Sequence, residues 1–133
     1  MMMTDGGRTD LMDKVASFSS CTRTELDLLS FIGTEVSFEP GAVIVAENAT
    51  GRECFVIAAG SAKVWRNGEY IGLLGPGQFF GEMSLLTGAA HNVTVTADTP
   101  LELLVLSPAE FDSLMVNAPT VVRKMLRERR SVA

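Results

Sequence analysis

The chain has 133 residues, of which 47% are hydrophobic and 20% charged, and its formal net charge at pH 7 is −5. This length and apolar content suit one folded domain, and the acidic balance argues against general binding to nucleic acid or to an anionic membrane. One His and two Cys are too few for a His/Cys zinc site, and no apolar run reaches the roughly 18–20 residues of a membrane span.

The first residues of the chain are polar and contain no hydrophobic run typical of a secretory signal. We expect residues 1–9 to be a flexible N-terminus and residues 10–133 to form a single domain. Without a secretory signal the expected location is the cytoplasm, where Cys21 and Cys54 would be reduced thiols.

Two short helices are predicted first, over Leu11–Phe18 and Arg23–Phe31, because apolar residues recur there at helical spacing. Thr22, followed three residues later by Glu25, is a capping-box pattern that marks the start of the second helix. The apolar face of that helix comprises Leu26, Leu29 and Ile32.

A β region follows. Ten of the twelve glycines lie between Gly33 and Gly88, and short β-branched segments fill the gaps between them. Strands of about five residues separated by glycine turns predict a compact antiparallel barrel or sandwich. The predicted strands are Glu35–Glu39, Val43–Ala46, Cys54–Ala58, Ala62–Arg66, Tyr70–Leu74, Asn92–Ala97 and Leu101–Leu106.

The last two predicted strands differ in pattern. Asn92–Ala97 alternates strictly, which predicts that Val93, Val95 and Ala97 share one buried face. Leu101–Leu106 is almost wholly apolar, so we expect it to be buried on both faces.

Two helices are predicted at the C-terminal end. Ser107 and Pro108 form an N-cap and first-turn pair that opens a helix through Val116, and Pro119 opens another over Thr120–Arg130. The apolar stripe of the last helix comprises Val121, Val122, Met125 and Leu126. The predicted fold class is therefore mainly β: an antiparallel β-roll of about eight strands, jelly-roll-like, with helices on both sides in the sequence.

The segment with the clearest chemistry is residues 75–86, Gly-Pro-Gly-Gln-Phe-Phe-Gly-Glu-Met-Ser-Leu-Leu. Its two aromatic residues are expected to anchor it in the core, and Gly81 frees the backbone at the start of a helical turn. Unpaired N–H groups at such a start attract an anion. The Glu82 carboxylate could accept two sugar hydroxyls while the amides of Met83 to Leu85 hold a phosphate. The alternative is that Glu82 only caps its own turn.

These residues resemble the cyclic nucleotide-binding domain of catabolite activator protein, protein kinase A regulatory subunits and cyclic nucleotide-gated channels. The resemblance extends roughly from Leu11 to Arg130. The matching motifs are Pro40-Gly41 before Val43-Ile44, Phe55-Val56-Ile57 with Gly60, Leu74-Gly75-Pro76-Gly77, Phe80-Gly81-Glu82-Met83-Ser84-Leu85, Thr94-Val95, and Ser107-Pro108 with Phe111 and Leu114.

The resemblance implies a site and a ligand. Gly81 would let the backbone approach the ligand, Glu82 would bind the ribose 2′-hydroxyl, and Met83, Ser84 and Leu85 would supply amide donors. The last helix would close over the base. The implied ligand is a cyclic nucleotide, with cAMP expected ahead of cGMP, and no cofactor is required.

One position departs from the family. Its phosphate-binding arginine lies in an Arg-x-Ala-Thr-Val pattern, where this chain has His91, Asn92 and Thr94. No Lys or Arg occurs between Asn67 and Val122. His91 could contact phosphate in the protonated form; the alternative is a loop histidine with no ligand. The cations that could reach in from other strands are Arg52, Lys63 and Arg66.

The C-terminal segment is basic. Residues 1–122 carry 6 basic and 15 acidic side chains, whereas residues 123–133 carry 5 and 1. The basic residues either complement the dipole of the last helix or dock onto an acidic surface. The apolar stripe of that helix either packs in the core or covers a purine.

Two functions from different classes follow from these observations. The first is a small regulatory module that senses a cyclic nucleotide and signals through movement of its C-terminal helices. Those helices would contact a second copy or an effector protein, with no nucleic acid or membrane bound by this chain alone. The second is a degenerate member that has lost the nucleotide and acts as a protein-interaction module. No enzyme is expected, because Cys21, Cys54, Ser84 and His91 form no recognisable nucleophile–base set.

Overall fold

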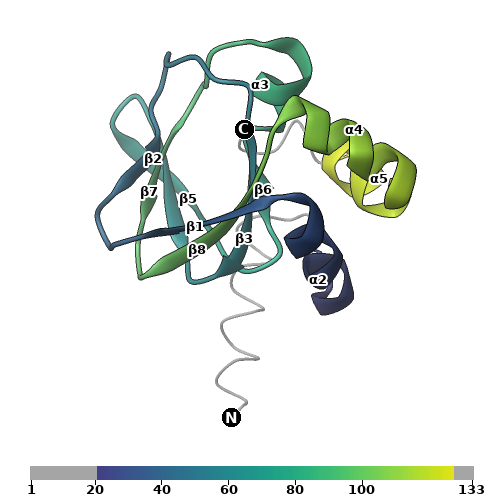
Figure 1. The fold of residues 1–133 in the computed structure, drawn as a ribbon. Helices are drawn as coiled ribbons and strands as arrows, with labels where there is room; N and C mark the ends of the chain where they lie inside the picture. Colours follow the sequence, from purple (N-terminus) through teal and green to yellow (C-terminus); the bar gives the residue numbers. More distant parts are fainter. Residues whose placement is uncertain (1–20, 128–133) are drawn as a thin grey trace.

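The computed structural model describes residues 21–127. It contains two four-stranded antiparallel sheets with helices beside them (Figure 1). In chain order the elements are α2 (Arg23–Ile32), β1 (Thr34–Phe38), β2 (Val43–Val45), β3 (Cys54–Ala59), β4 (Ala62–Arg66), β5 (Glu69–Leu74), β6 (Phe79–Phe80), α3 (Glu82–Thr87), β7 (Thr94–Ala97), β8 (Leu101–Leu106), α4 (Pro108–Asn117) and α5 (Pro119–Arg127).

The predicted fold class is confirmed. One sheet has the order β1-β8-β3-β6 and the other the order β2-β7-β4-β5, so consecutive strands often lie in different sheets, as in a β-roll. The predicted flexible segment 1–9 and the helix over Leu11–Phe18 lie outside the described residues. α4 and α5 form where the two C-terminal helices were predicted, although the predicted end of the last helix, residues 128–130, lies outside the described residues. α4 begins with a complete capping box between Ser107 and Glu110.

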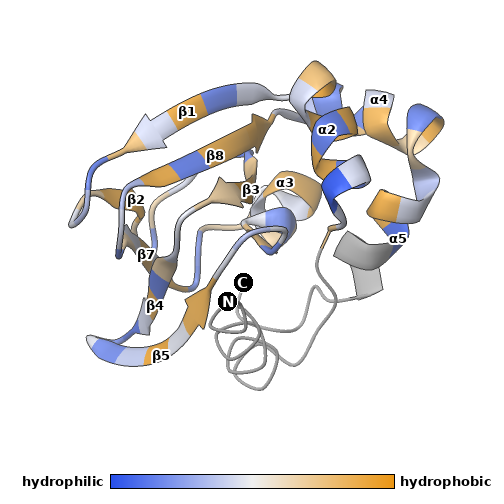
Figure 2. Ribbon diagram, turned by 90° about the horizontal axis from the view of Figure 1, so that it is seen from below, coloured by the Kyte–Doolittle hydropathy of each residue, from blue (hydrophilic) through white to orange (hydrophobic). Residues whose placement is uncertain are grey.

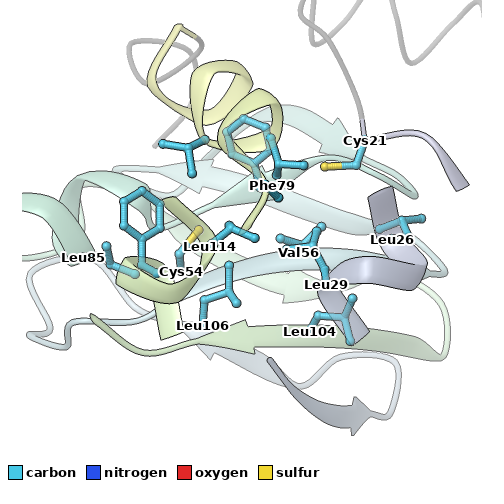
Figure 3. Close-up of a cluster of buried hydrophobic side chains, with 14 residues drawn as sticks. Cys21, Leu26, Leu29, Cys54, Val56, Phe79, Leu85, Leu104, Leu106 and Leu114 are labelled. Atoms are coloured by element: carbon cyan, nitrogen blue, oxygen red, sulfur yellow. The ribbon is translucent and has the colours of Figure 1, made fainter. Parts of the chain in front are cut away.

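Two hydrophobic cores lie on opposite faces of the first sheet. In β3, Cys54 and Val56 face the helices, whereas Phe55 and Ile57 face the interior between the sheets. Strand alternation assigns the residues in this way, because successive side chains point to opposite faces. Figure 3 shows the helix-side core, with Leu29 of α2 close to the sheet residues.

The structure corrects the prediction in three places. One strand, the two-residue β6, was not predicted, because two residues are too few to show a periodicity. β7 begins at Thr94 rather than Asn92, where its pairing with Trp65 starts. β8 is buried on both faces as predicted, with Leu101 and Leu103 between the sheets and Leu104 and Leu106 against the helices, except at Glu102, which is exposed (Figure 2, the blue segment in β8).

Within the described part of the chain no helix is long and apolar enough to cross a membrane.

Candidate functional site

The short helix α3 starts from a conformation that requires glycine. Gly81, the N-cap of α3, has φ 86° and ψ 6°, in the left-handed region. A Cβ at this position would lie 2.8 Å from the backbone carbonyl oxygen of Glu53. The neighbouring Phe80 is fixed by pairing with Phe55, whose ring stacks on it at a centroid distance of 4.9 Å. The two sheets therefore set where α3 begins.

Glu82 is the first residue of α3 and is only 1% exposed. Its Oε1 atom has no hydrogen-bond partner among the described residues. Burial raises the pKa of the Glu82 carboxyl to about 7, and a hydrogen bond from its own backbone N–H opposes that rise only in part. A buried acceptor without a partner is costly, and a ligand hydroxyl would remove that cost.

His91 lies next to α3. It is 8% exposed, and its Nδ1 is 3.2 Å from Oγ of Ser84, so these two predicted site residues are in contact. The His91 backbone exchanges two hydrogen bonds with the loop after β2, donating to the Ala49 carbonyl at 3.0 Å and accepting from Asn48 N–H at 2.7 Å. Burial lowers the pKa of His91, so the imidazole is neutral at pH 7.

The predicted amide donors differ in their availability. The Leu85 N–H donates to the Gly81 carbonyl at 3.1 Å, an intrahelical bond that occupies it. The Met83 and Ser84 amides belong to the first turn, where a helix supplies no carbonyl partner. The expectation of three free amides is therefore wrong for Leu85, because this helix begins at Glu82 and its first internal bond ends at Leu85.

Asn92 and Thr94 do not join this group. They lie on the face of their segment opposite to Val93 and Val95, which are buried between the sheets. The Thr94 hydroxyl accepts a hydrogen bond from the Glu47 N–H at 3.0 Å. Asn92 is exposed. Neither side chain contacts α3 in the hydrogen bonds of the described residues.

The three cations considered above have different positions. The Arg52 guanidinium donates to the Leu85 carbonyl at 3.1 Å, so it holds the loop before β3 to α3. Lys63 forms an ion pair with Asp98 at 3.5 Å. Arg66 Nε donates to the Asn92 carbonyl at 3.4 Å, next to His91. The Ser84–His91 and Arg52–Leu85 contacts were not predicted, since each joins segments whose proximity only the fold determines.

A cavity of about 350 Å³ opens on the other side of His91. It is lined by β2 and the loop that follows it, together with the side chains of Glu53, Phe55 and His91. A Cβ on Gly51 in this loop would lie 3.8 Å from His91 Nε2, so the imidazole edge that does not face Ser84 faces this loop.

The other residues singled out in the sequence either pack in the helix-side core or are not arranged to bind a ligand. Val121 and Val122 of α5 are 1% and 6% exposed and pack in that core, which favours the packing interpretation of their stripe. The side chains of Met125 and Leu126 lie outside the described part. Cys21 and Cys54 are buried thiols that are not joined in a disulfide, and no group of three His, Cys, Asp or Glu among the described residues could hold a metal ion.

Comparison with known proteins gives a consistent result. A family model described as "Cyclic nucleotide-binding domain" matches residues 35–118. The chain is 28% identical over 120 residues to the cAMP-dependent protein kinase regulatory subunit of Schizosaccharomyces pombe, covering 90% of this chain and 29% of that protein. It is 38% identical over 96 residues to a cyclic nucleotide-gated potassium channel of Mesorhizobium japonicum, covering 70% of this chain and 26% of the channel. The chain thus spans less than a third of each of these curated relatives.

Solved structures share the fold. The catabolite activator protein of Thermus thermophilus superposes with a TM-score of 0.71 at 28% identity, covering 82% of this chain and 55% of that one. A structure described under "A cyclic-GMP-dependent signalling pathway regulates bacterial phytopathogenesis" superposes with a TM-score of 0.73 at 26% identity, covering 84% of this chain and 92% of that one.

Proposed function

Since the chain belongs to the cyclic nucleotide-binding domain family, we propose that it is a regulatory module that binds a cyclic nucleotide at the group formed by Gly81, Glu82, Ser84 and His91. The observation that carries this proposal is the buried Glu82 carboxyl, whose Oε1 accepts no hydrogen bond from any residue that the structure describes. Ribose hydroxyls are donors of the kind that this atom lacks. The Ser84–His91 pair at 3.2 Å adds polar atoms for the phosphate.

The expected ligand is cAMP, with cGMP as the second candidate. The similar proteins are described with both nucleotides, since one is cAMP-dependent and another belongs to a cyclic-GMP-dependent pathway. The output proposed for the module is a shift in the position of α4 and α5, which pack on β3 and β8 through the helix-side core. Leu85 of α3 belongs to the same core, so a ligand that moves α3 acts directly on this packing.

The same proposal involves no catalytic step. Its partners are the nucleotide and, through the C-terminal helices, a second copy of the chain or an effector protein. The competing function, an interaction module without nucleotide, is favoured by one observation: position 91 carries a neutral imidazole in place of the family's guanidinium.

Thermal unfolding with and without millimolar cAMP or cGMP distinguishes these two functions. A ligand at about 100 times its Kd adds about 2.7 kcal/mol to the free energy of unfolding, so binding by the wild type raises Tm measurably. His91→Arg should tighten binding by roughly ten- to a hundredfold, because it restores a charge-assisted hydrogen bond to phosphate.

Asn92→Arg is the matched control for His91→Arg, since it adds the same charge at the next residue, on the opposite face. It should leave nucleotide binding close to that of the wild type. A Tm shift in His91→Arg alone would mean that the wild-type pocket is degenerate and would support the interaction module. No shift in any variant would refute the nucleotide site.

Nucleotide binding should also depend on pH. The pKa of His91 is lowered by burial in the free protein, and a bound phosphate would raise it, so binding takes up a proton. The Glu82 carboxyl, with a pKa of about 7 in the free protein, contributes in the opposite direction, because ribose hydroxyls that donate to it favour its ionised form and binding then releases its proton. The contribution of His91 should therefore increase the affinity as the pH falls from about 8 to about 6, and that of Glu82 should oppose it.

Calorimetric titration at both ends of this pH range measures the effect. His91→Gln keeps a polar neutral side chain, and it should remove the share of the pH dependence that belongs to His91 while leaving that of Glu82. A pH dependence that is identical in the wild type and in His91→Gln would argue against proton uptake by His91.

A further inference from the structure

Arg66 is the last residue of β4, and strand alternation places it on the inward face of its sheet. Ala62 and Val64 of this strand are fully buried between the two sheets. Lys63 and Trp65 point the other way, where Lys63 meets Asp98 on the outer face. Because side chains alternate along a strand, Arg66 follows Ala62 and Val64 on the inward face. Its side chain is exposed at the end of the strand.

The register between β4 and β7 brings this face toward His91. Val64 pairs with Val95 and Trp65 with Thr94, where the paired register ends, so Arg66, the next residue of β4, lies beside the segment before β7 that contains His91. β4 and β7 lie side by side in the same sheet (Figure 2). Diagonal neighbours on one sheet face are within reach of a long side chain such as arginine.

A contact supports this placement. Arg66 Nε donates to the carbonyl of Asn92 at 3.4 Å, so the guanidinium already lies beside the residue that follows His91. Two carboxylates belong to this corner: Glu69 is paired with Arg66 across the β4–β5 hairpin, and Glu47 accepts from the backbone N–H of Asn67 at 2.9 Å. The ion pairs of the described residues do not include Arg66.

The other cations whose side chains the structure describes bind other groups or lie away from His91. Arg23 pairs with Asp27 on α2 at 3.6 Å, and Arg52 binds the Leu85 carbonyl at the far end of α3. Lys63 is on the opposite face of β4. Arg123 is exposed on α5. Among the described side chains, Arg66 is therefore the cation whose strand face leads to His91.

We propose that Arg66 supplies the positive charge that binds the phosphate of the cyclic nucleotide, in place of an arginine at position 91. This inference rests on the proposed function and names a further binding residue of the same site. Arginine suits the role because its planar guanidinium can donate to Asn92 and to a phosphate oxygen at the same time.

Calorimetric titration of cAMP and cGMP into the wild type, Arg66→Gln and Lys63→Gln tests the inference. Glutamine keeps an amide donor for Asn92 and removes only the charge, and Lys63→Gln removes a charge from the outer face of the same strand. Arg66→Gln should weaken binding about tenfold and reduce its salt dependence. Lys63→Gln should change neither, and Arg66→Lys should retain part of the affinity.

The outcomes separate this inference from the proposed function. If the wild type binds nucleotide and Arg66→Gln binds equally well, the role of Arg66 is refuted and the site remains. If Arg66→Gln weakens binding only as much as Lys63→Gln does, the effect is general electrostatics, and the role of Arg66 is again refuted. If neither the wild type nor His91→Arg binds, both proposals fail together.

Discussion

Replacing Glu82 by glutamine should make the protein more stable at pH 8, by about 3 kcal/mol or roughly 10 °C in Tm. The folded protein raises the pKa of this carboxyl from 4.5 to about 7, so the folded state binds the proton more tightly than the unfolded state. The contribution of this carboxyl to the free energy of unfolding is therefore greatest below about pH 4.5, and it is lost as the pH rises through 7. Glutamine does not ionise, so its variant escapes the loss.

The difference between the two proteins should depend on pH. At pH 5 the carboxyl is mostly protonated in the fold, and Glu82→Gln should have nearly the stability of the wild type. The gap should widen between pH 5 and pH 8. Glu102→Gln, on the exposed part of β8, is the matched control and should show no such widening. A Glu82→Gln variant that is less stable than the wild type at pH 8 would contradict this account of the site.

The same substitution should weaken nucleotide binding. Removing an ionisable acceptor for two ribose hydroxyls should cost about 1.5–3 kcal/mol, which is roughly ten- to a hundredfold in Kd. A variant that gains stability and loses ligand affinity is the behaviour expected of a residue kept for binding. Affinity equal to that of the wild type would instead support the interpretation that Glu82 only caps its own turn.

Gly81→Ala should destabilise the fold by roughly 3 kcal/mol or more. Alanine in the left-handed region costs about 1–2 kcal/mol by itself. Its Cβ would also lie 2.8 Å from the Glu53 carbonyl oxygen, so either β3 or α3 must shift. Urea unfolding measures the effect, and nucleotide titration of the folded fraction should reveal a displaced site.

Gly41→Ala separates the two causes. Gly41 has φ +90°, close to that of Gly81, but nothing lies within 4 Å of the Cβ that alanine would add. This control should lose only about 1–2 kcal/mol. Equal losses of stability in the two variants would mean that the close approach of the added Cβ to the Glu53 carbonyl oxygen has no cost.

Local features of the fold could be predicted from the sequence because their causes lie within a few residues. The capping box at Thr22 forms as predicted, and the predicted N-cap Ser107 forms a full capping box as well. Each depends on residues only three positions apart. The strict alternation from Asn92 predicted the buried face of Val93, Val95 and Ala97, and all three are buried. β6 escaped prediction, since two residues carry no periodicity.

The candidate site could be predicted only in part. The residues around Gly81 were identified from a continuous motif, and the structure places Ser84 beside His91 at 3.2 Å. The burial of Glu82 and the inward position of Arg66 depend on strand register and on how the sheets close. These are long-range properties that a single sequence does not encode in any local pattern. For this reason the absence of arginine at position 91 was evident from the sequence, whereas Arg66 could be named only as one of three cations, together with Arg52 and Lys63.

The charges at the site determine how tightly it would bind a nucleotide and how that affinity depends on pH. The family's cation is missing at position 91, the Oε1 of the buried Glu82 has no hydrogen-bond partner within the described part of the chain, and His91 is neutral in the free protein. A nucleotide phosphate entering this site meets a carboxyl that prefers to be protonated and an imidazole that can take up a proton. We therefore expect weaker binding than an arginine site provides, with a contribution from His91 that strengthens as the pH falls.

The central claim is that the cyclic nucleotide binds at the start of α3, and amide chemical shifts test it most directly. A ¹⁵N–¹H spectrum of the wild type would be recorded at pH 6.5 during titration with cAMP and then with cGMP. The account predicts saturable shifts concentrated at Gly81 to Ser84 and at His91, with smaller changes in α4 and α5. A spectrum unchanged by millimolar concentrations of both nucleotides, or shifts confined to surfaces away from α3, would contradict it.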